Sequence, residues 1–144
     1  MRPASIFATA EAAEEAFYDA MHRGDLAAMM SLWADDDEPV CVHPSGARLV
    51  GLRAIRESFE AIFATGGMDI RPSQVRVVSG AGIEVRALIE RIFAVEGGKP
   101  RIIECAATNV FVKSALGWRI LLHHGGPGVS SAAAETPQPG NLLH

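Results

Sequence analysis

The spacing of apolar residues changes once along the chain, near residue 68, and this change restricts the fold more than any other feature. Before it, apolar residues recur every three or four positions, which is the period of an amphipathic helix. After it, they alternate with polar residues, which is the period of a strand. Helices first and antiparallel strands afterwards is the order of an α+β domain. We therefore expect helices that cover one face of a curved antiparallel sheet.

Three helices are predicted before the change. The first begins after Thr9, whose hydroxyl can cap it, and stops at Gly24. Asp25 caps a second helix, whose apolar stripe reaches Trp33. That helix ends at the run ADDDEP, because the residue before a proline avoids the helical region. The third carries an apolar face over 52–63 and ends at a pair of glycines.

Strands are predicted in the rest of the chain. The sequence VCVHPSG indicates a strand over 40–43 that ends in a proline turn, and a short strand over 48–50 follows it. Four longer strands, with turns at SGAG, EGGK and SALG, are expected over 69–79, 83–95, 101–113 and 118–124. The small, polar and proline-bearing end of the chain is typical of a flexible tail. The predicted organisation is one domain over 1–126 and a tail over 127–144.

Composition restricts the partners. The chain has 144 residues, 49% hydrophobic and 21% charged, which is typical of a single globular domain. The net charge is −4 and Lys and Arg form no cluster, so no nucleic-acid partner is expected. No segment approaches the roughly 18 apolar residues of a membrane span, so no membrane partner is expected. Cys41 and Cys105 show no paired spacing and no signal sequence is apparent, which predicts a cytoplasmic location. No glycine-rich phosphate loop is present, so no cofactor is implied.

Three motifs connect this order of elements to a known family. They are GDLAAMMSLWADD in the second helix, HPSGARLVGLRAI across a strand, a turn and a helix, and GWRI in a hairpin that ends in a histidine pair. On these motifs, residues 8–125 resemble the nuclear transport factor 2-like superfamily and, within it, the SnoaL-like group. The resemblance implies a cone-shaped shell in which a curved sheet and about three N-terminal helices enclose one apolar pocket, and dimers that form through the outer sheet face. Members include isomerases, cyclases and dehydratases, but also transport adaptors and kinase assembly domains, so the fold alone assigns no function.

Ketosteroid isomerase, a member of the same superfamily, allows a comparison of single residues. Its general base is an aspartate just before a P-x-G turn, and the matching turn HPSG places His43 at that position. Its oxyanion hole uses a tyrosine on the first helix, where this chain has Phe17, with Tyr18 one residue away. The hole also uses a protonated aspartate on a late strand, near Lys113 and Ser114 here. The base has changed type and both donors are absent, so enolisation of a steroid-like ketone by that mechanism is not expected.

Pairing across the hairpins predicts which side chains share a face of the sheet, because opposed residues point to the same side. A SALG loop of two or four residues sets Phe111 opposite Ile120 and Ala107 opposite His124. One face then combines apolar and polar residues, as a small-molecule pocket requires: Arg86, Glu90, Ile92, Ile103, Asn109, Phe111, Trp118, Ile120, Leu122 and His124. The other face is mostly apolar and suits a dimer interface. An odd-length loop or a β-bulge would exchange the two faces.

Three ionisable residues are the candidates for catalysis. His43 can take or give a proton near neutral pH; the alternative is a histidine that bonds only to the turn backbone. His124 can orient a polar substrate group together with Asn109; the alternative is a histidine at a frayed sheet edge. Glu90 can act as an acid or base with its charge compensated by Arg86; the alternative is a structural ion pair.

The remaining candidates contribute to ligand binding. They are Tyr18 at the pocket rim, Trp33 at its floor, and four sheet residues, Arg86, Asn109, Phe111 and Trp118. The alternative for Trp33 is a plain core residue, which is the more common role of such a residue. The alternative for Tyr18 is a phenol exposed to solvent. A metal set of Cys41, His43 and His124 lacks the tight spacing of zinc motifs, so no metal is expected.

The sequence thus predicts a homodimeric domain that binds a small apolar molecule bearing polar groups. As an enzyme it would be an isomerase, cyclase or dehydratase in which His43 exchanges a proton with the substrate. The alternative is a non-catalytic binding or assembly module that associates through the outer face of the sheet. The sequence leaves both open.

Overall fold

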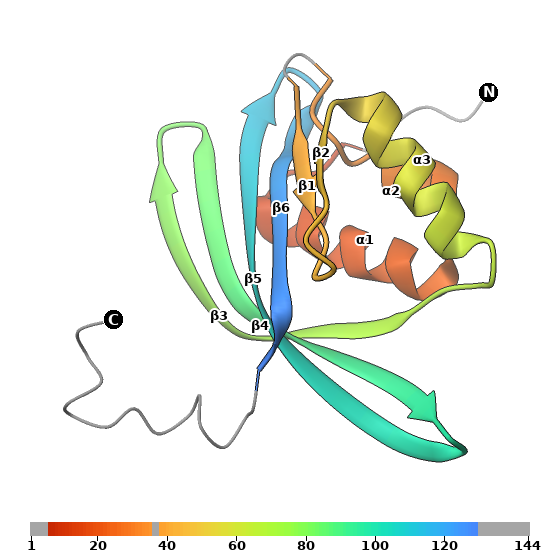
Figure 1. Cartoon of the computed structure of the whole chain (residues 1–144). Coiled ribbons are helices and arrows are strands. Elements are labelled where there is room, and N and C mark those ends of the chain that lie inside the picture. Colours follow the sequence, from red (N-terminus) through yellow and green to blue (C-terminus); the bar gives the residue numbers. More distant parts are fainter. Residues whose placement is uncertain (1–5, 36–37, 130–144) are drawn as a thin grey trace, which may run out of the picture.

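The structure is a computed structural model that describes residues 6–35 and 38–129, with the helices preceding most of the sheet (Figure 1). Its elements are α1 (Ala10–Arg23), α2 (Leu26–Met30), β1 (Val40–Val42), β2 (Arg48–Val50), α3 (Leu52–Phe63), β3 (Asp69–Gly80), β4 (Ile83–Glu96), β5 (Lys99–Ser114) and β6 (Gly117–Val129). Six strands form one sheet in the order β2-β1-β6-β5-β4-β3. The predicted α+β architecture is confirmed.

The predicted helix caps are present. The hydroxyl of Thr9 accepts a hydrogen bond from the N–H of Ala12 at 3.0 Å, and Gly24 closes α1 in the left-handed conformation, with φ of 62°. The carboxylate of Asp25 accepts a hydrogen bond from the N–H of Ala28 at 3.0 Å and so caps α2. These local signals fix where the first two helices begin.

The second helix is shorter than predicted. It ends at Met30, so Trp33 does not lie on its stripe. The chain leaves the helix because it pairs with β6: Ile120 donates its N–H to the carbonyl of Leu32, and Ala34 donates to the carbonyl of Ile120, both at 2.8 Å. Residues that bond to a strand cannot complete another helical turn. Trp33 is therefore a buried core residue.

The predicted register is confirmed in the middle of the sheet. Arg86 pairs with Asn109 across β4 and β5. Arg91 pairs with Glu104, and their side chains form an ion pair at 3.7 Å. Because Arg86 and Asn109 are buried, this register sets the inner face of the sheet and leaves Arg91 on the outer face.

A β-bulge in β6 changes the register next to the hairpin. Phe111 pairs with Ile120 as predicted, but Val110 pairs with Leu122, so Leu121 is the extra residue. From Leu122 to the predicted end of the strand at His124, the side chains therefore point to the side opposite from the one predicted. The predicted inward positions of Leu122 and His124 are therefore wrong.

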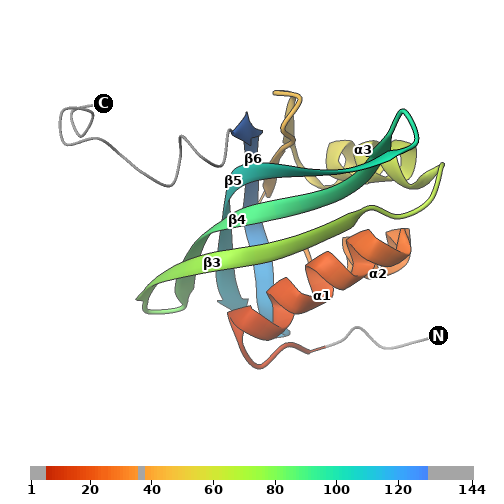
Figure 2. The same ribbon diagram turned by 90° about the horizontal axis from the view of Figure 1, so that it is seen from below.

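The helices cover the inner face of the sheet. Figure 1 places all three on the same side of the curved strands, and Figure 2 shows α1 alongside β3. The largest fully buried side chains lie between the two layers and include Phe17, Met29, Leu32, Ile55, Phe59, Phe111 and Ile120. Phe17 contacts both Trp33 and Phe59 edge-on, with ring centroids 6.5 and 6.4 Å apart.

The last strand runs on to Val129, past its predicted end. The predicted tail lies, from residue 130 onward, outside the described residues. Within the described residues, no helix is both long and apolar enough to cross a membrane.

Candidate functional site

A cavity of about 630 Å³ opens between the inner face of the sheet, α3 and the turn after β1. Its walls are mostly apolar and include Met21, Leu49, Phe59, Ile62, Ile70, Ile92 and Ile103. Ionisable side chains reach it at three points: His43 from the end of β1, and Glu90 and His123 from β4 and β6. An apolar cavity with a few convergent polar groups is the usual form of a small-molecule site.

His43 is held by the turn that follows it. Gly46 donates its N–H to the carbonyl of His43 at 2.8 Å, which closes the proline turn. The Nε2 atom of His43 lies 2.7 Å from the hydroxyl of Ser58 on α3, and the ring packs edge-on against Phe59 at 5.3 Å. Burial lowers the pKa of His43, so the imidazole is neutral near pH 7 and can accept a proton.

Cys41 lies beside His43 on the same side of the strand, with its sulfur 3.8 Å from Nε2. Burial, and next to it the charge of Glu90, raises the pKa of the Cys41 thiol to about 12. The thiol is therefore protonated near neutral pH. Since the thiolate is the nucleophile, Cys41 is a buried core residue rather than a reactive group.

A hydrogen-bonded network lies behind Glu90 and His123. Tyr18 donates its hydroxyl hydrogen to Oε2 of Glu90 at 2.8 Å. The amide nitrogen of Asn109 donates to Oε2 of Glu14 at 3.1 Å and to the hydroxyl of Tyr18 at 3.2 Å. Nδ1 of His123 lies 2.6 Å from Oδ1 of Asn109. One chain of bonds thus connects α1 with three strands of the sheet.

Arg86 supplies the positive charge of this network. Its Nε donates to Glu14 at 3.0 Å and one terminal nitrogen donates to Glu84 at 2.9 Å. Arg86, Glu14 and Glu90 are all at least nine-tenths buried. The predicted pairing of Arg86 with Glu90 is therefore replaced: the guanidinium compensates Glu14, and Glu90 bonds to Tyr18 instead.

The buried groups nearest the cavity resist ionisation. Burial, and after it the charge of Glu14, raises the pKa of Glu90, although the hydrogen bond from Tyr18 opposes this shift. Burial lowers the pKa of His123 to about 3, with smaller effects from His43 and His124. His123 is therefore neutral near pH 7, and its 3.9 Å approach to Glu90 is not an ion pair.

The structure separates the predicted site residues into four groups. His43 and Glu90 line the cavity, whereas Tyr18, Arg86 and Asn109 belong to the network behind its wall. Trp33 and Phe111 are core residues, and Trp118 packs half-buried at the edge of the core. His124 is exposed on the outer face, opposite Thr108, because the bulge turned it away. The predicted pocket position of His124 is wrong, and His123 takes its place.

Three residues of the site were missed in the sequence. Regular alternation next to an inward His124 would place His123 on the outer face, and the β-bulge that reverses this leaves no clear signal in the sequence. Ser58 precedes the apolar position Phe59 on α3 and was not distinguished from a surface serine. Glu14 lies four residues before Tyr18, so both share one face of α1, and that spacing could have identified it.

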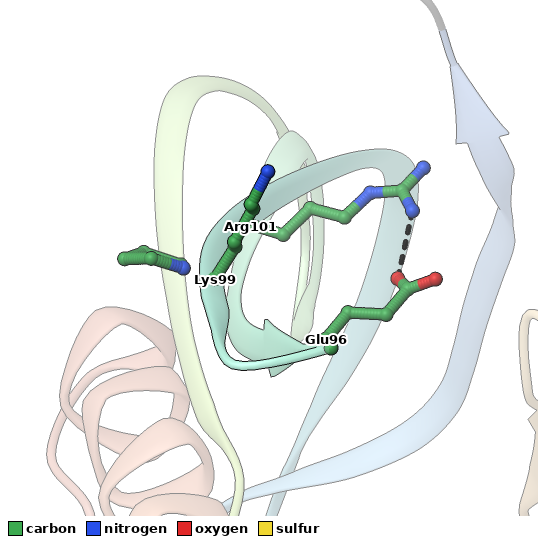
Figure 3. A pocket seen from close by; sticks show the side chains of 5 residues that line it. Glu96, Lys99 and Arg101 are labelled. Atoms are coloured by element: carbon green, nitrogen blue, oxygen red, sulfur yellow. Dashed lines mark hydrogen bonds and ion pairs between the residues drawn. The ribbon is translucent and has the colours of Figure 1, made fainter.

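A second hollow, of about 460 Å³, lies at the tip of the β4–β5 hairpin (Figure 3). Arg101 donates to Glu96 at 2.7 Å there, and Lys99 is the third charged side chain. All three residues are exposed, and solvent screens such pairs. The hollow therefore lacks a buried group that could orient a ligand. Over 6–35 and 38–129, no three His, Cys, Asp or Glu side chains are grouped to hold a metal ion.

Comparisons with known proteins agree with this architecture. A family model described as a SnoaL-like domain matches residues 10–130. A Thiobacillus denitrificans structure described as a "putative calcium/calmodulin-dependent protein kinase type II association domain" is 36% identical, with 88% of this chain and 98% of that chain covered and a TM-score of 0.76. A Streptomyces avermitilis structure described as a "putative dehydratase from the NTF2-like family" is 28% identical, with 82% and 93% covered and a TM-score of 0.74.

A more distant structure supports the fold alone. A Caulobacter vibrioides protein with a cystatin-like fold is 16% identical, with 86% of this chain and 89% of that chain covered and a TM-score of 0.71. No curated protein matches the sequence.

Proposed function

Since the chain belongs to the SnoaL-like domain family, we propose that it binds a small, largely apolar molecule in its cavity and catalyses a proton transfer on it. The observation that carries this proposal is that a neutral imidazole and a carboxyl group of raised pKa face the same apolar cavity. The neutral imidazole can take a proton, and the raised pKa of the carboxyl favours the protonated form that can give one. Isomerisation, cyclisation and dehydration can each use such a pair.

His43 is the proposed base and Glu90 the proposed acid. Ser58 holds the His43 ring from α3, so the imidazole keeps one orientation toward the bound molecule. Tyr18 holds the Glu90 carboxyl in the same way. His124 has no part in this mechanism because it lies on the outer face.

Dehydration is the reaction that uses both groups most directly. A C–H bond of the substrate breaks and its proton passes to His43, while the electron pair forms a C=C bond. The neighbouring C–O bond breaks, and the leaving hydroxyl takes a proton from Glu90 to become water. The Streptomyces avermitilis relative, described as a "putative dehydratase", supports this choice by likeness.

A ligand screen followed by turnover measurements tests the proposal. Thermal shifts against small ketones, hydroxyketones, terpenoids and aromatic acids identify molecules that stabilise the wild type. Turnover of the best of them should fall by about 100-fold or more in His43→Ala, with the thermal unfolding temperature little changed. His22→Ala, at the exposed end of α1, is the matched control and should turn over as the wild type does. Equal turnover in wild type and His43→Ala would contradict the assignment of the base.

Assembly through the outer sheet face is the second candidate function. An apolar row crosses four strands there, because Val78 pairs with Val85, Val85 with Val110 and Val110 with Leu122. Val78 is 69% exposed, and such a row favours contact with a second copy. The Thiobacillus denitrificans relative, described as a "putative calcium/calmodulin-dependent protein kinase type II association domain", supports this second candidate by likeness.

Variants on the two faces distinguish the candidates. Val110→Glu should convert a dimer into a monomer in analytical ultracentrifugation, whereas His43→Ala should leave the dimer intact. If the protein serves only in assembly, Val110→Glu should abolish its function, and His43→Ala should leave that function unchanged. A wild type that sediments as a monomer would contradict the assembly candidate.

A further inference from the structure

We propose that the inner end of the cavity recognises the hydroxyl group of an uncharged, largely apolar molecule, through Nε2 of His123 and the carboxyl of Glu90, and that it rejects carboxylates. This inference rests on the proposed function, because it assigns the ligand class of the same cavity. It depends on which atoms of the buried network carry hydrogens.

Glu14 fixes the orientation of the Asn109 amide. The carboxylate of Glu14 pairs with the guanidinium of Arg86 at 3.0 Å, and the oxygen atoms of a carboxylate only accept hydrogen bonds. The atom of Asn109 that faces Glu14 at 3.1 Å must therefore be the NH₂ nitrogen. Its second hydrogen goes to the hydroxyl of Tyr18, so that both hydrogens are used. The amide oxygen of Asn109 is left to face His123.

The Asn109 oxygen fixes the tautomer of His123. An amide oxygen is an acceptor only, so Nδ1 of His123, 2.6 Å away, must carry the hydrogen. A neutral imidazole has a single ring hydrogen, which leaves Nε2 with an exposed lone pair. Asn109 is thus a positioning residue that keeps His123 as an acceptor toward the cavity.

The gap between His123 and Glu90 fits one oxygen atom. Nε2 of His123 and Oε2 of Glu90 are 3.9 Å apart, which is too far for a direct hydrogen bond. An oxygen placed between them can lie within about 2.8 Å of both. A hydroxyl there can donate its hydrogen to Nε2 of His123, and it can accept one from the Glu90 carboxyl in its protonated form, which the raised pKa favours. A ketone oxygen only accepts, so it leaves the lone pair of His123 unpaired.

Carboxylates are disfavoured by the charges around the same gap. No Lys or Arg is among the residues that line the cavity in the part of the chain that the structure describes. Arg86, a buried cation of the network behind the cavity wall, already bonds to Glu14 and Glu84. A carboxylate would bring a negative charge and only acceptor atoms against a lone pair and a carboxyl group.

Binding of matched probes tests this selectivity. Each of three apolar skeletons, cyclohexyl, decalyl and perhydrophenanthryl, is offered to the full chain as alcohol, ketone and carboxylate at pH 7. On the skeleton that binds best, the alcohol should bind about tenfold or more tightly than the ketone, and the carboxylate about 100-fold or more weakly than the alcohol. His123→Asn removes the Nε2 position but keeps an amide that can donate to Asn109, and it should reduce the alcohol preference to within about threefold. His124→Asn, on the outer face, should keep the full preference.

The outcomes separate this inference from the proposed function. If alcohol and ketone bind equally well, or the carboxylate binds best, the selectivity is wrong while the cavity remains a ligand site. If no probe on any skeleton binds, the proposed function fails and the inference fails with it. If His123→Asn does not fold, the ring-nitrogen ¹⁵N spectrum of the wild type decides: a hydrogen on Nδ1 supports the proposal, and a hydrogen on Nε2 overturns it.

Discussion

One buried residue, His123, should contribute most to the destabilisation of this protein by acid. Its pKa in the folded state is about 3, against an ordinary value of 6.5, because burial disfavours the charged ring. Between these two pH values the unfolded chain binds a proton that the folded chain does not. Stability is therefore full above pH 6.5 and is lost as the pH falls toward 3.

The expected loss of stability follows from the size of the pKa shift of His123. Each pH unit below 6.5 lowers the free energy of unfolding by about 1.4 kcal/mol through His123, which gives about 2 kcal/mol between pH 7.5 and pH 5.0. His43, with a lowered pKa, acts in the same direction. Glu90, with a raised pKa, acts in the opposite direction, since its folded form holds a proton that the unfolded form releases. Wild-type stability alone therefore mixes several groups.

A non-titrating variant isolates the histidine. Urea unfolding followed by circular dichroism at pH 7.5 and pH 5.0 gives the free energy of unfolding that wild type and His123→Asn each lose between the two pH values. The loss should be smaller by about 2 kcal/mol in the variant, whatever its stability at pH 7.5. His124→Asn, at an exposed position, is the control and should lose as much as the wild type. Parallel losses in wild type and His123→Asn would refute the reasoning.

Three further outcomes follow from local features. Thr9→Ala removes the cap of α1 and should lower the free energy of unfolding by about 1 kcal/mol in urea titrations. Thr9→Ser is the conservative control, and an unchanged free energy of unfolding in Thr9→Ala would contradict the prediction. Cys41, with a pKa of about 12, should react with iodoacetamide at pH 8 only in urea, as followed by mass spectrometry, and rapid labelling of the folded protein would contradict its burial. Gly67→Ala should lower the free energy of unfolding by about 2 kcal/mol or more, because a Cβ there would overlap the carbonyl oxygen of His22; an unchanged melting temperature would show that this contact can relax.

Local signals in the sequence predicted the framework well. Thr9, Gly24 and Asp25 act through bonds to their near neighbours, so their effects can be predicted without knowing the rest of the fold. The alternation of β4 and β5 likewise predicted the inner positions of Glu90 and Asn109, because pairing in a regular hairpin depends only on the turn.

The failures occurred where distant segments meet. Trp33 left its helix because β6, almost ninety residues later, offers it a backbone partner. His123 and His124 exchanged faces because of one extra residue, Leu121, that the SALG turn does not reveal. The bond from Glu14 to Arg86 joins a helix to a strand and has no local signal in either. Of the residues that line the cavity, the sequence therefore predicted Glu90 and His43, but not the hydrogen bonds that orient them.

Deuterium incorporation tests the central claim, proton transfer in the cavity, most directly. A β-hydroxyketone that stabilises the wild type is incubated with the protein in D₂O, and ¹H NMR follows loss of the signal from the carbon between the two oxygen-bearing carbons. The wild type should introduce deuterium at that carbon about 100-fold or more faster than His43→Ala, and Glu90→Gln should also be slower than the wild type. Rates in the wild type that match those of His43→Ala, or that match the protein-free reaction, would contradict the account.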